Sequence, residues 1–393
     1  MNAKMIELWY KKTWFLQKLV ILLIGCICMG FWGKIDFFIA DDHSLNIQYL
    51  WDTITINLPQ YHSLVYWNPY YNCGESSLSL YPPGFVILGI FINTITFHQL
   101  SMEGIYILLL MVIYYLPGFT SLMLFRRLGL GRGTALVGAL CFMLYNRLDI
   151  GGDVNGGMLV GLLNARLSTG IAPLILYFGI GCLEGKNCLK NSMLTGITLA
   201  FCLLSHPWEG MWGPLGLFLF FVCYTIDSLR TKTKKTPILF LIASGFIAFG
   251  LAAFWYLPAL AHSDFLRRSF LWQFYPEHIY NYLQILWLFL VLYLLAIWWV
   301  LNTASTTQKR MILPLLWLPG LNIIIIQTAY YLFFKVFGIE LLDPYRIKNG
   351  FFFSVILLSA VGVEQLRTWL FSQQHHVSEF CQKLIFVGLG IVI

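Results

Sequence analysis

Charged residues are scarce in this chain. Lys, Arg, Asp and Glu make up 11% of the 393 residues, whereas roughly a quarter of a soluble protein is charged. Hydrophobic residues make up 59%. This composition excludes an ordinary soluble domain and indicates a membrane protein with many spans. The net charge of +7 does not indicate nucleic-acid binding, because many basic residues lie in short clusters between apolar runs, where they set membrane topology.

Two kinds of site signature are also missing. The nine cysteines are scattered and form neither a disulfide framework nor a zinc-ligand spacing. The glycine-rich segment 151–157 lacks the Lys-Ser or Lys-Thr that follows a nucleotide-binding loop, so such a loop is excluded.

Long apolar runs dominate the rest of the chain. The first run, Leu19 to Phe31, follows several lysines and has no clear cleavage site, which predicts an uncleaved first helix with a cytoplasmic N-terminus. Further runs cover residues 82–97, 105–125, 134–145, 168–183, 193–204, 211–226, 237–257, 282–301, 311–334 and 351–363. The longer ones can cross a hydrocarbon core of about 30 Å, and the shorter ones need flanking residues to do so.

Basic clusters define the expected threading. They fit the cytoplasm if only one net crossing lies between residues 81 and 126. Pro82 to Phe97 begins with a proline pair and is shorter than the ~20 residues of a full span, so we expect a partial helix at the outer surface. The basic clusters are Arg126-Arg127 with Arg132, Lys186 with Lys190, Arg230 to Lys235, Lys309-Arg310, and Arg367.

The predicted fold is therefore an all-α polytopic membrane protein with about ten to eleven transmembrane helices and a partial helix in the first outer loop. We expect one transmembrane domain over residues 1–393, with the outer loop 33–81 carrying an acidic motif. The final apolar stretch, Leu384 to Ile393, has ten residues, or about 15 Å as helix, and suggests a chain truncated within a span.

This threading places the polar motifs on one face of the membrane, as an outward-facing site requires. The clearest is Asp41-Asp42-His43, which follows the first span. Adjacent carboxylates repel each other, so such a pair suits a site that binds a proton, a metal ion or a reacting hydroxyl, although a solvated acidic loop has the same appearance. The other motifs are Asn72 to Pro83, Gly151 to Gly157, Ser205 to Glu209, and Asp343 to Arg346.

A first helix that enters an acidic outer loop, followed by many spans, resembles the class C glycosyltransferases. Within that superfamily the chain is most similar to the bacterial membrane proteins labelled 6-pyruvoyl-tetrahydropterin-synthase-related, a label that implies no pterin chemistry here. The matching residues are Asp41-Asp42, Gly74-Glu75, Tyr81-Pro82-Pro83-Gly84, His206 and Tyr345-Arg346.

The resemblance implies transfer of a sugar from a polyprenyl-phosphate carrier to an acceptor on the outer face, in the plasma (inner) membrane. Asp41 is the expected general base, with Glu75 in reserve. Asp42 could raise the proton affinity of Asp41 or bind a divalent cation, Mg or Mn, that offsets the charge of the leaving phosphate. The adjacent pair differs from the Asp-x-Asp pair of some relatives, which leaves metal dependence open.

Arg346, beside Tyr345, is the expected phosphate ligand, because a guanidinium can hold two phosphate oxygens. Arg166 and Arg267-Arg268 are alternatives, and Arg346 could instead be an interfacial arginine. We expect His206, Trp208 and Tyr81 to contact the substrate, although a helix-end histidine, interfacial aromatic residues and a structural Tyr-Pro-Pro-Gly turn would look the same.

Two other classes fit the composition. A solute transporter or lipid flippase would have intramembrane charges along a pathway and paired repeats, and neither is clear here. A non-catalytic membrane scaffold would tolerate a change at Asp41. The identities of the sugar, the acceptor glycan, lipid or protein, and the oligomeric state stay open.

Overall fold

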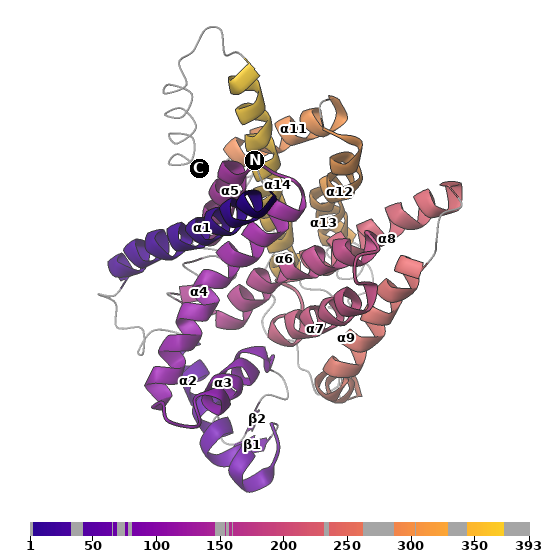
Figure 1. Ribbon diagram of the computed structural model, residues 1–393. Helices are drawn as coiled ribbons and strands as arrows, with labels where there is room; N and C mark the ends of the chain where they lie inside the picture. Colours follow the sequence, from indigo (N-terminus) through magenta and orange to yellow (C-terminus); the bar gives the residue numbers. More distant parts are fainter. Residues whose placement is uncertain are drawn as a thin grey trace.

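A computed structural model of the protein describes residues 3–32, 42–64, 66–68, 75–77, 81–145, 154, 157–158, 160–231, 236–261, 287–302, 304–328 and 344–372. These residues form a helical membrane protein with one short antiparallel hairpin, so the all-α prediction is confirmed (Figure 1). The expected base Asp41 and the apolar stretch 384–393 lie outside the described residues.

The helices follow the apolar runs of the sequence. Seven of those in the described part are long and apolar enough to cross a membrane, which makes the chain a multi-pass integral membrane protein. They lie within α4 (Met102–Arg127), α6 (Leu163–Leu183), α7 (Cys188–Ser205), α8 (Trp212–Thr231), α9 (Thr236–Ala261), the pair α12 (Thr306–Leu316) and α13 (Leu318–Gln327), and α14 (Pro344–Ser372). The remaining helices of the bundle are α1 (Ala3–Trp32), α5 (Arg132–Leu144) and α11 (Trp287–Asn302).

Two expected spans differ in detail from the sequence-based prediction. The run 311–334 is interrupted at Trp317, because Pro314 lies in the last turn of α12 and Pro319 in the first turn of α13. Helix α5 has 13 residues, or about 20 Å, and reaches only part of the way across a hydrocarbon core without its flanking residues.

Helices α6 and α14 are the most buried of the candidate spans. Figure 1 shows α6 in the middle of the bundle, where it packs against α4, α7 and α8, while α14 packs against α11, α13 and α5. Gly362 lets α14 approach α11 closely, since a Cβ at this position would lie 1.9 Å from the carbonyl oxygen of Leu292. By contrast, α9 exposes large apolar side chains, including Phe246, Phe249 and Phe254, as a lipid-facing helix does.

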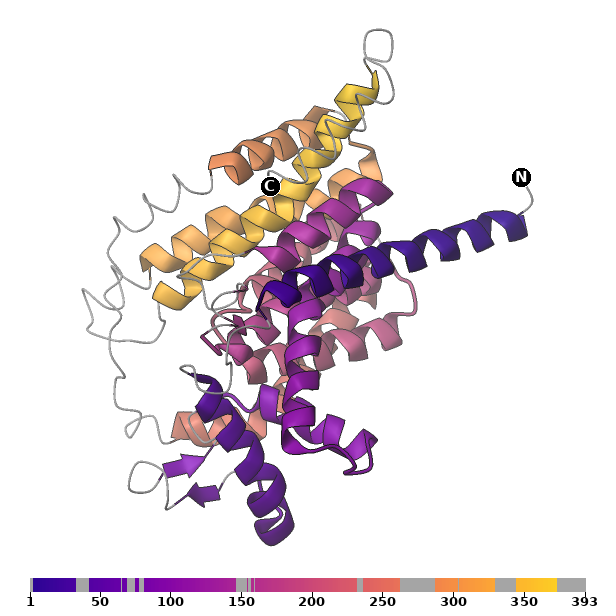
Figure 2. The same cartoon turned by 90° about the vertical axis from the view of Figure 1, so that its left-hand side faces the viewer.

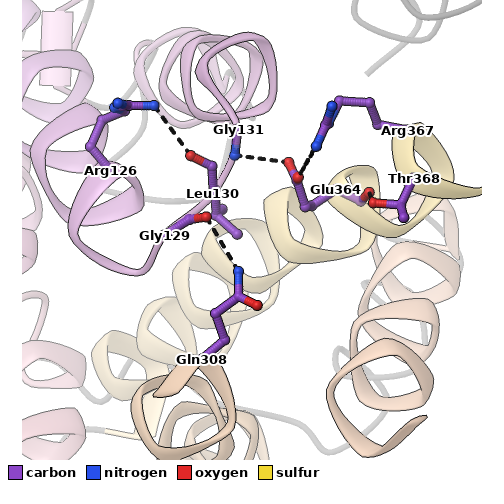
Figure 3. Close-up of polar contacts among 8 residues, drawn as sticks. All are labelled: Arg126, Gly129, Leu130, Gly131, Gln308, Glu364, Arg367 and Thr368. Atoms are coloured by element: carbon purple, nitrogen blue, oxygen red, sulfur yellow. Dashed lines mark hydrogen bonds and ion pairs between the residues drawn. The ribbon is translucent and has the colours of Figure 1, made fainter. Parts of the chain in front are cut away.

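Polar contacts at one end of the bundle tie the helix ends together (Figure 3). Glu364 of α14 accepts a hydrogen bond from the backbone N–H of Gly131 at 3.0 Å, at the positive N-terminus of α5, and pairs with Arg367. The side chain of Gln308 in α12 donates to the Gly129 carbonyl at 3.3 Å. Arg127 and Lys186 both pair with Glu184. We call this the basic end.

The opposite end is capped by elements from the first 95 residues. Helix α2 (Asp42–Asp52) continues as a π-helix η1 (Thr53–Tyr61), then β1 (Tyr66–Asn68) and β2 (Glu75–Ser77) form the hairpin, and α3 (Gly84–Ile95) follows. In both views these elements lie together at the bottom of the molecule (Figure 2). The expected partial helix is confirmed as α3, which has 12 residues.

The helix over residues 42–61 is new relative to the sequence analysis, which treated residues 33–81 as a loop. Its buried residues His43, Asn46, Tyr49 and Leu50 recur at helical spacing. Because polar residues occupy half of this buried face, hydropathy alone did not reveal the helix.

Candidate functional site

Helix α2 begins within the acidic motif, and its first residues are fixed to the segment before α6. The Asp42 N–H donates to the Val160 carbonyl at 3.0 Å, and the Asn46 side chain donates to the Gly161 carbonyl at 2.6 Å. The buried His43 ring bonds to the Met158 carbonyl through Nε2 at 3.0 Å. We call these three hydrogen bonds the α2 clamp.

The clamp determines the tautomer of His43. A carbonyl oxygen only accepts, so Nε2 carries the proton. The Nδ1 atom lies 2.6 Å from the Tyr106 hydroxyl, and in the neutral imidazole it accepts a hydrogen bond from that hydroxyl. Both nitrogens of His43 are therefore engaged, and the residue orients the motif instead of serving as the base.

Gly161 permits the close approach of the two segments. Its φ of +87° is unfavourable for other residues, and a Cβ here would lie 2.6 Å from the backbone nitrogen of His43. A larger residue would push the start of α2 away from the Met158 and Val160 carbonyls. This glycine lies just beyond the segment 151–157, and the sequence analysis did not single it out.

The Tyr-Pro-Pro-Gly element is held by the first turn of α6. Asn164, 2% exposed, donates to the Pro82 carbonyl and accepts from the Phe85 N–H, each at 3.0 Å. Pro83 is the N-cap residue of α3, so the proline pair starts the partial helix as expected. The half-buried Tyr81 donates weakly to Asn46 of α2 at 3.4 Å and packs on Tyr49.

The start of α3 also meets the end of α7. A Cβ on Gly84 would lie 2.7 Å from the Cα of Ser205, so the Tyr-Pro-Pro-Gly element abuts the residue before His206. His206 ends α7 with an extended φ of −160°, and its Nδ1 accepts from the Glu209 N–H at 3.2 Å. The structure thus brings Asp42, Tyr81 and His206 to one end of the bundle, which we call the motif end.

Glu209 connects the His206 turn to α14. Its side chain is fully buried, and its Oε2 atom accepts a hydrogen bond from the Asn349 side chain at 2.5 Å. The expected phosphate ligand Arg346 and its neighbour Tyr345 lie in the first turn of α14, although their side chains lie outside the described residues. Trp208 is half-buried against the core.

The helix start at Pro344 adds a favourable field for a phosphate. The N-terminus of an α-helix carries a partial positive charge and unpaired N–H groups. Arg346 belongs to this turn, so its placement in the chain suits an anion ligand at the motif end.

Arg166 differs from its expected role. It is fully buried in α6, where its guanidinium donates to the Met143 carbonyl at 2.5 Å near the end of α5 and lies 3.5 Å from the Tyr114 carbonyl. It therefore satisfies backbone carbonyls inside the bundle, and its expected role as an alternative phosphate ligand is wrong. Glu75 lies in β2, paired with Asn68, and its side chain is outside the described residues, as are Arg267 and Arg268.

Asp52 is a carboxylate that the sequence analysis missed. It ends α2, where burial raises the pKa of its carboxyl, partly offset by a hydrogen bond from Gln48. It lies ten residues from Asp42, or about 15 Å along the helix, too far to act with Asp42 as a pair.

The described donors do not by themselves fit a resident metal ion. Within the described ranges, no cluster of three or more His, Cys, Asp or Glu side chains has the geometry of a metal site. Asp42 is the one described carboxylate of the motif, and the nitrogens of His43 are engaged by Tyr106 and Met158.

The fold was compared with known proteins. No protein-family model and no curated protein sequence matches this chain. The apo oligosaccharyltransferase of Archaeoglobus fulgidus aligns with a TM-score of 0.54 and 13% identity, over 98% of this chain and 55% of that chain. The oligosaccharyltransferase AglB of the same organism, in complex with an inhibitory peptide and a dolichol-phosphate, aligns with a TM-score of 0.51 and 13% identity over the same shares.

The chain therefore spans about half the length of these solved structures. At this identity the likeness shows the fold alone. The chain shares the fold of these oligosaccharyltransferases, and this agrees, at the level of the fold, with the resemblance noted from the sequence.

Proposed function

We propose that this protein is a membrane glycosyltransferase that moves a sugar from a polyprenyl-phosphate-linked donor to an acceptor on the outer face of the plasma (inner) membrane. The observation that supports the proposal is the convergence at the motif end. There the α2 clamp holds the start of α2, Tyr81 contacts Asn46 of α2, and Gly84 abuts Ser205, the residue before His206. The class C glycosyltransferase fold supports the reaction class.

In this mechanism Asp41 takes the proton of the acceptor hydroxyl. The acceptor oxygen attacks the anomeric carbon of the sugar and forms the new glycosidic bond. The bond between that carbon and the phosphate oxygen breaks, and its electron pair leaves with the polyprenyl phosphate. Asp42 raises the proton affinity of Asp41 or binds a divalent cation, and Glu75 is the reserve base.

The remaining site residues bind the donor. Arg346 in the first turn of α14 holds the phosphate, with the helix N-terminus adding to the positive field and Tyr345 beside it. Tyr81, His206 and Trp208 face the sugar and the lipid headgroup region.

The opposite end of the bundle faces the cytoplasm in this proposal. Gln17 of α1 donates to the Arg132 carbonyl at 2.7 Å, so the first helix joins the basic end. Basic residues favour the cytoplasmic side of a membrane, which leaves the motif end on the outer side.

The proposal is tested by sugar transfer in membranes that express the full chain. A panel of radiolabelled polyprenyl-phosphate sugars is offered to the wild type, Asp41→Asn and Arg346→Ala. Glu103→Gln, an exposed acid in the first turn of α4, and Arg310→Ala, at the basic end, are the matched controls. We expect transfer that collapses in the two site variants and persists in the two controls.

Each other outcome has a definite meaning. Transfer that persists in Asp41→Asn removes Asp41 from the mechanism. If the wild type transfers sugar from no donor but moves the sugar lipid across the membrane of sealed vesicles, the protein is a flippase. If the wild type neither transfers sugar nor moves sugar lipid across the membrane, the non-catalytic scaffold is the class that fits.

A further inference from the structure

The buried pair Glu209 and Asn349 joins two elements that are far apart in the sequence. Asn349 Nδ2 donates to Glu209 Oε2 at 2.5 Å, and both side chains are fully buried. Glu209 belongs to the turn after α7, and Asn349 belongs to α14, so the bond spans 140 residues of chain. It links the turn after His206 to the N-terminal part of α14.

Both partners lie next to residues proposed to bind the donor. Glu209 donates its backbone N–H to His206 Nδ1, which fixes the imidazole and the carboxylate on the same turn. Asn349 lies three residues after Arg346 on α14, so the two residues lie on the same side of the helix. Motion of Asn349 relative to Glu209 would therefore move the first turn of α14 relative to His206.

The polar groups around the pair are not all hydrogen-bonded, as they would be in a contact that serves stability alone. Asn349 Oδ1, Asn322 Oδ1 and Trp212 Nε1 are all buried and have no hydrogen-bond partner in the described part of the chain. Gly350 lies close to both neighbours, since a Cβ there would be 2.5 Å from Asn322 Oδ1 and 3.4 Å from Trp212 Cβ. Buried polar groups without partners lower the stability of the folded state, and an apolar contact would hold these helices together without that loss of free energy.

The other end of α14 provides the contrast. Glu364 is also buried, but its carboxylate oxygens are engaged by the Gly131 N–H and by Arg367 (Figure 3). The basic end thus has a satisfied glutamate that joins helices. At the motif end, Glu209 has Asn349 as a partner and lies near buried polar groups without one in the described part of the chain, namely Asn349 Oδ1, Asn322 Oδ1 and Trp212 Nε1, an arrangement characteristic of functional sites.

We propose that Glu209 and Asn349 are positioning residues that set the first turn of α14, and with it Arg346, at the distance from His206 that the donor phosphate requires. This inference rests on the proposed function. Because the two residues act through Arg346 and His206 and not on the sugar, their loss raises the KM for the lipid donor more than it lowers kcat. A misplacement of about 1 Å costs roughly a hundredfold in such a site, and a looser helix end costs less.

The test is a charge exchange across the pair. In Glu209→Gln the amide oxygen still accepts from Asn349, so we expect a donor KM within about threefold of the wild type. Asn349→Asp places two carboxylates against each other, and we expect a donor KM raised about tenfold to a hundredfold. The double variant restores one hydrogen bond in the reverse direction and should recover most of the loss.

Two further variants keep the test decisive. Asn349→Leu removes the donor without adding charge, and it covers the case in which Asn349→Asp does not fold; we expect its donor KM to rise about tenfold. Glu364→Gln is the control at the basic end of the same helix. It should lower the midpoint of thermal unfolding and leave the donor KM unchanged.

The experiment uses the full chain in nanodiscs, with donor KM and kcat, thermal midpoint, and the shift of that midpoint by polyprenyl phosphate as readouts. A donor KM in Asn349→Leu and Asn349→Asp that matches that of Glu364→Gln, while the wild type transfers sugar, overturns the inference and leaves the proposed function standing. A wild type that neither transfers sugar nor responds to polyprenyl phosphate overturns the proposed function, and the inference falls with it.

Discussion

Gly161→Ala tests whether the α2 clamp sets the position of the acidic motif. The new methyl group would lie 2.6 Å from the His43 nitrogen and 2.9 Å from the Asp42 carbonyl carbon, both of them backbone atoms. Backbone cannot rotate away as a side chain can, so the start of α2 must move. The hydrogen bonds from Asp42 to Val160 and from Asn46 to Gly161 would then lengthen or break.

The expected loss of stability in Gly161→Ala has two parts, and a control variant separates them. A positive φ costs a non-glycine residue about 1–2 kcal/mol. The loss of one or two clamp hydrogen bonds adds about 0.5–3 kcal/mol, since each contributes a net ~0.5–1.5 kcal/mol. Gly185→Ala is the matched control, because Gly185 has a φ of +73° and no atom within 4 Å of the position that a Cβ would occupy.

The assay compares the two variants for unfolding and for sugar transfer. We expect both to unfold at a lower temperature than the wild type, with Gly161→Ala the less stable by about 0.5–3 kcal/mol. Transfer should fall about tenfold to a hundredfold in Gly161→Ala alone, because the acidic motif moves relative to His206. Equal stability and equal transfer in the two variants would refute the idea that the clamp positions the motif.

Three other changes have definite expected outcomes. Tyr106→Phe removes the hydroxyl that is hydrogen-bonded to His43 Nδ1, so the variant should lose about 1–3 kcal/mol of stability in thermal unfolding, and an unchanged midpoint would contradict this buried hydrogen bond. Burial raises the pKa of the Asp52 carboxyl, so the folded state binds this proton more tightly than the unfolded state does. The stability that this group contributes therefore falls as the pH rises from the ordinary pKa of an aspartate, about 3.9, through the raised pKa of the folded state. Asp52→Asn should therefore gain stability relative to the wild type at neutral pH and lose that advantage near pH ~4, as measured by unfolding across pH; a pH-independent difference would contradict the assignment. Arg166→Met removes donors to the Met143 carbonyl, so it should lower the thermal midpoint while the donor KM stays within about twofold, whereas a large rise in donor KM would restore Arg166 as a phosphate ligand.

The sequence predicts the helices of the bundle more completely than the elements at its ends. The spans were visible because lipid requires long apolar runs with few charges, a constraint that each segment meets by itself. The partial helix α3 was visible for the same reason, since Pro82 and Pro83 start a run too short to span. The helix over residues 42–61 was not, because its inner face is made of polar residues such as His43 and Asn46 that find partners only in the folded protein.

The candidate site divides in the same way. Asp42, Tyr81 and His206 were named from the sequence, since polar residues at the ends of apolar runs are conspicuous in a chain with so little charge. Arg166 looked equally conspicuous, yet it is buried among the carbonyls of α4 and α5. Glu209 stood in a motif but had no visible role, because its partner Asn349 lies 140 residues further along the chain.

The sequence by itself determined that this is a helical membrane protein, and it showed the apolar runs and the polar motifs that a site at one end would use. It did so because hydropathy and basic clusters act locally, along a single segment. Only the tertiary structure decided that the carbonyls before α6 clamp α2, that Asn164 holds the Tyr-Pro-Pro-Gly element, and that Glu209 fastens α14. These are hydrogen bonds between groups far apart in the chain, and their geometry exists only once the helices have packed.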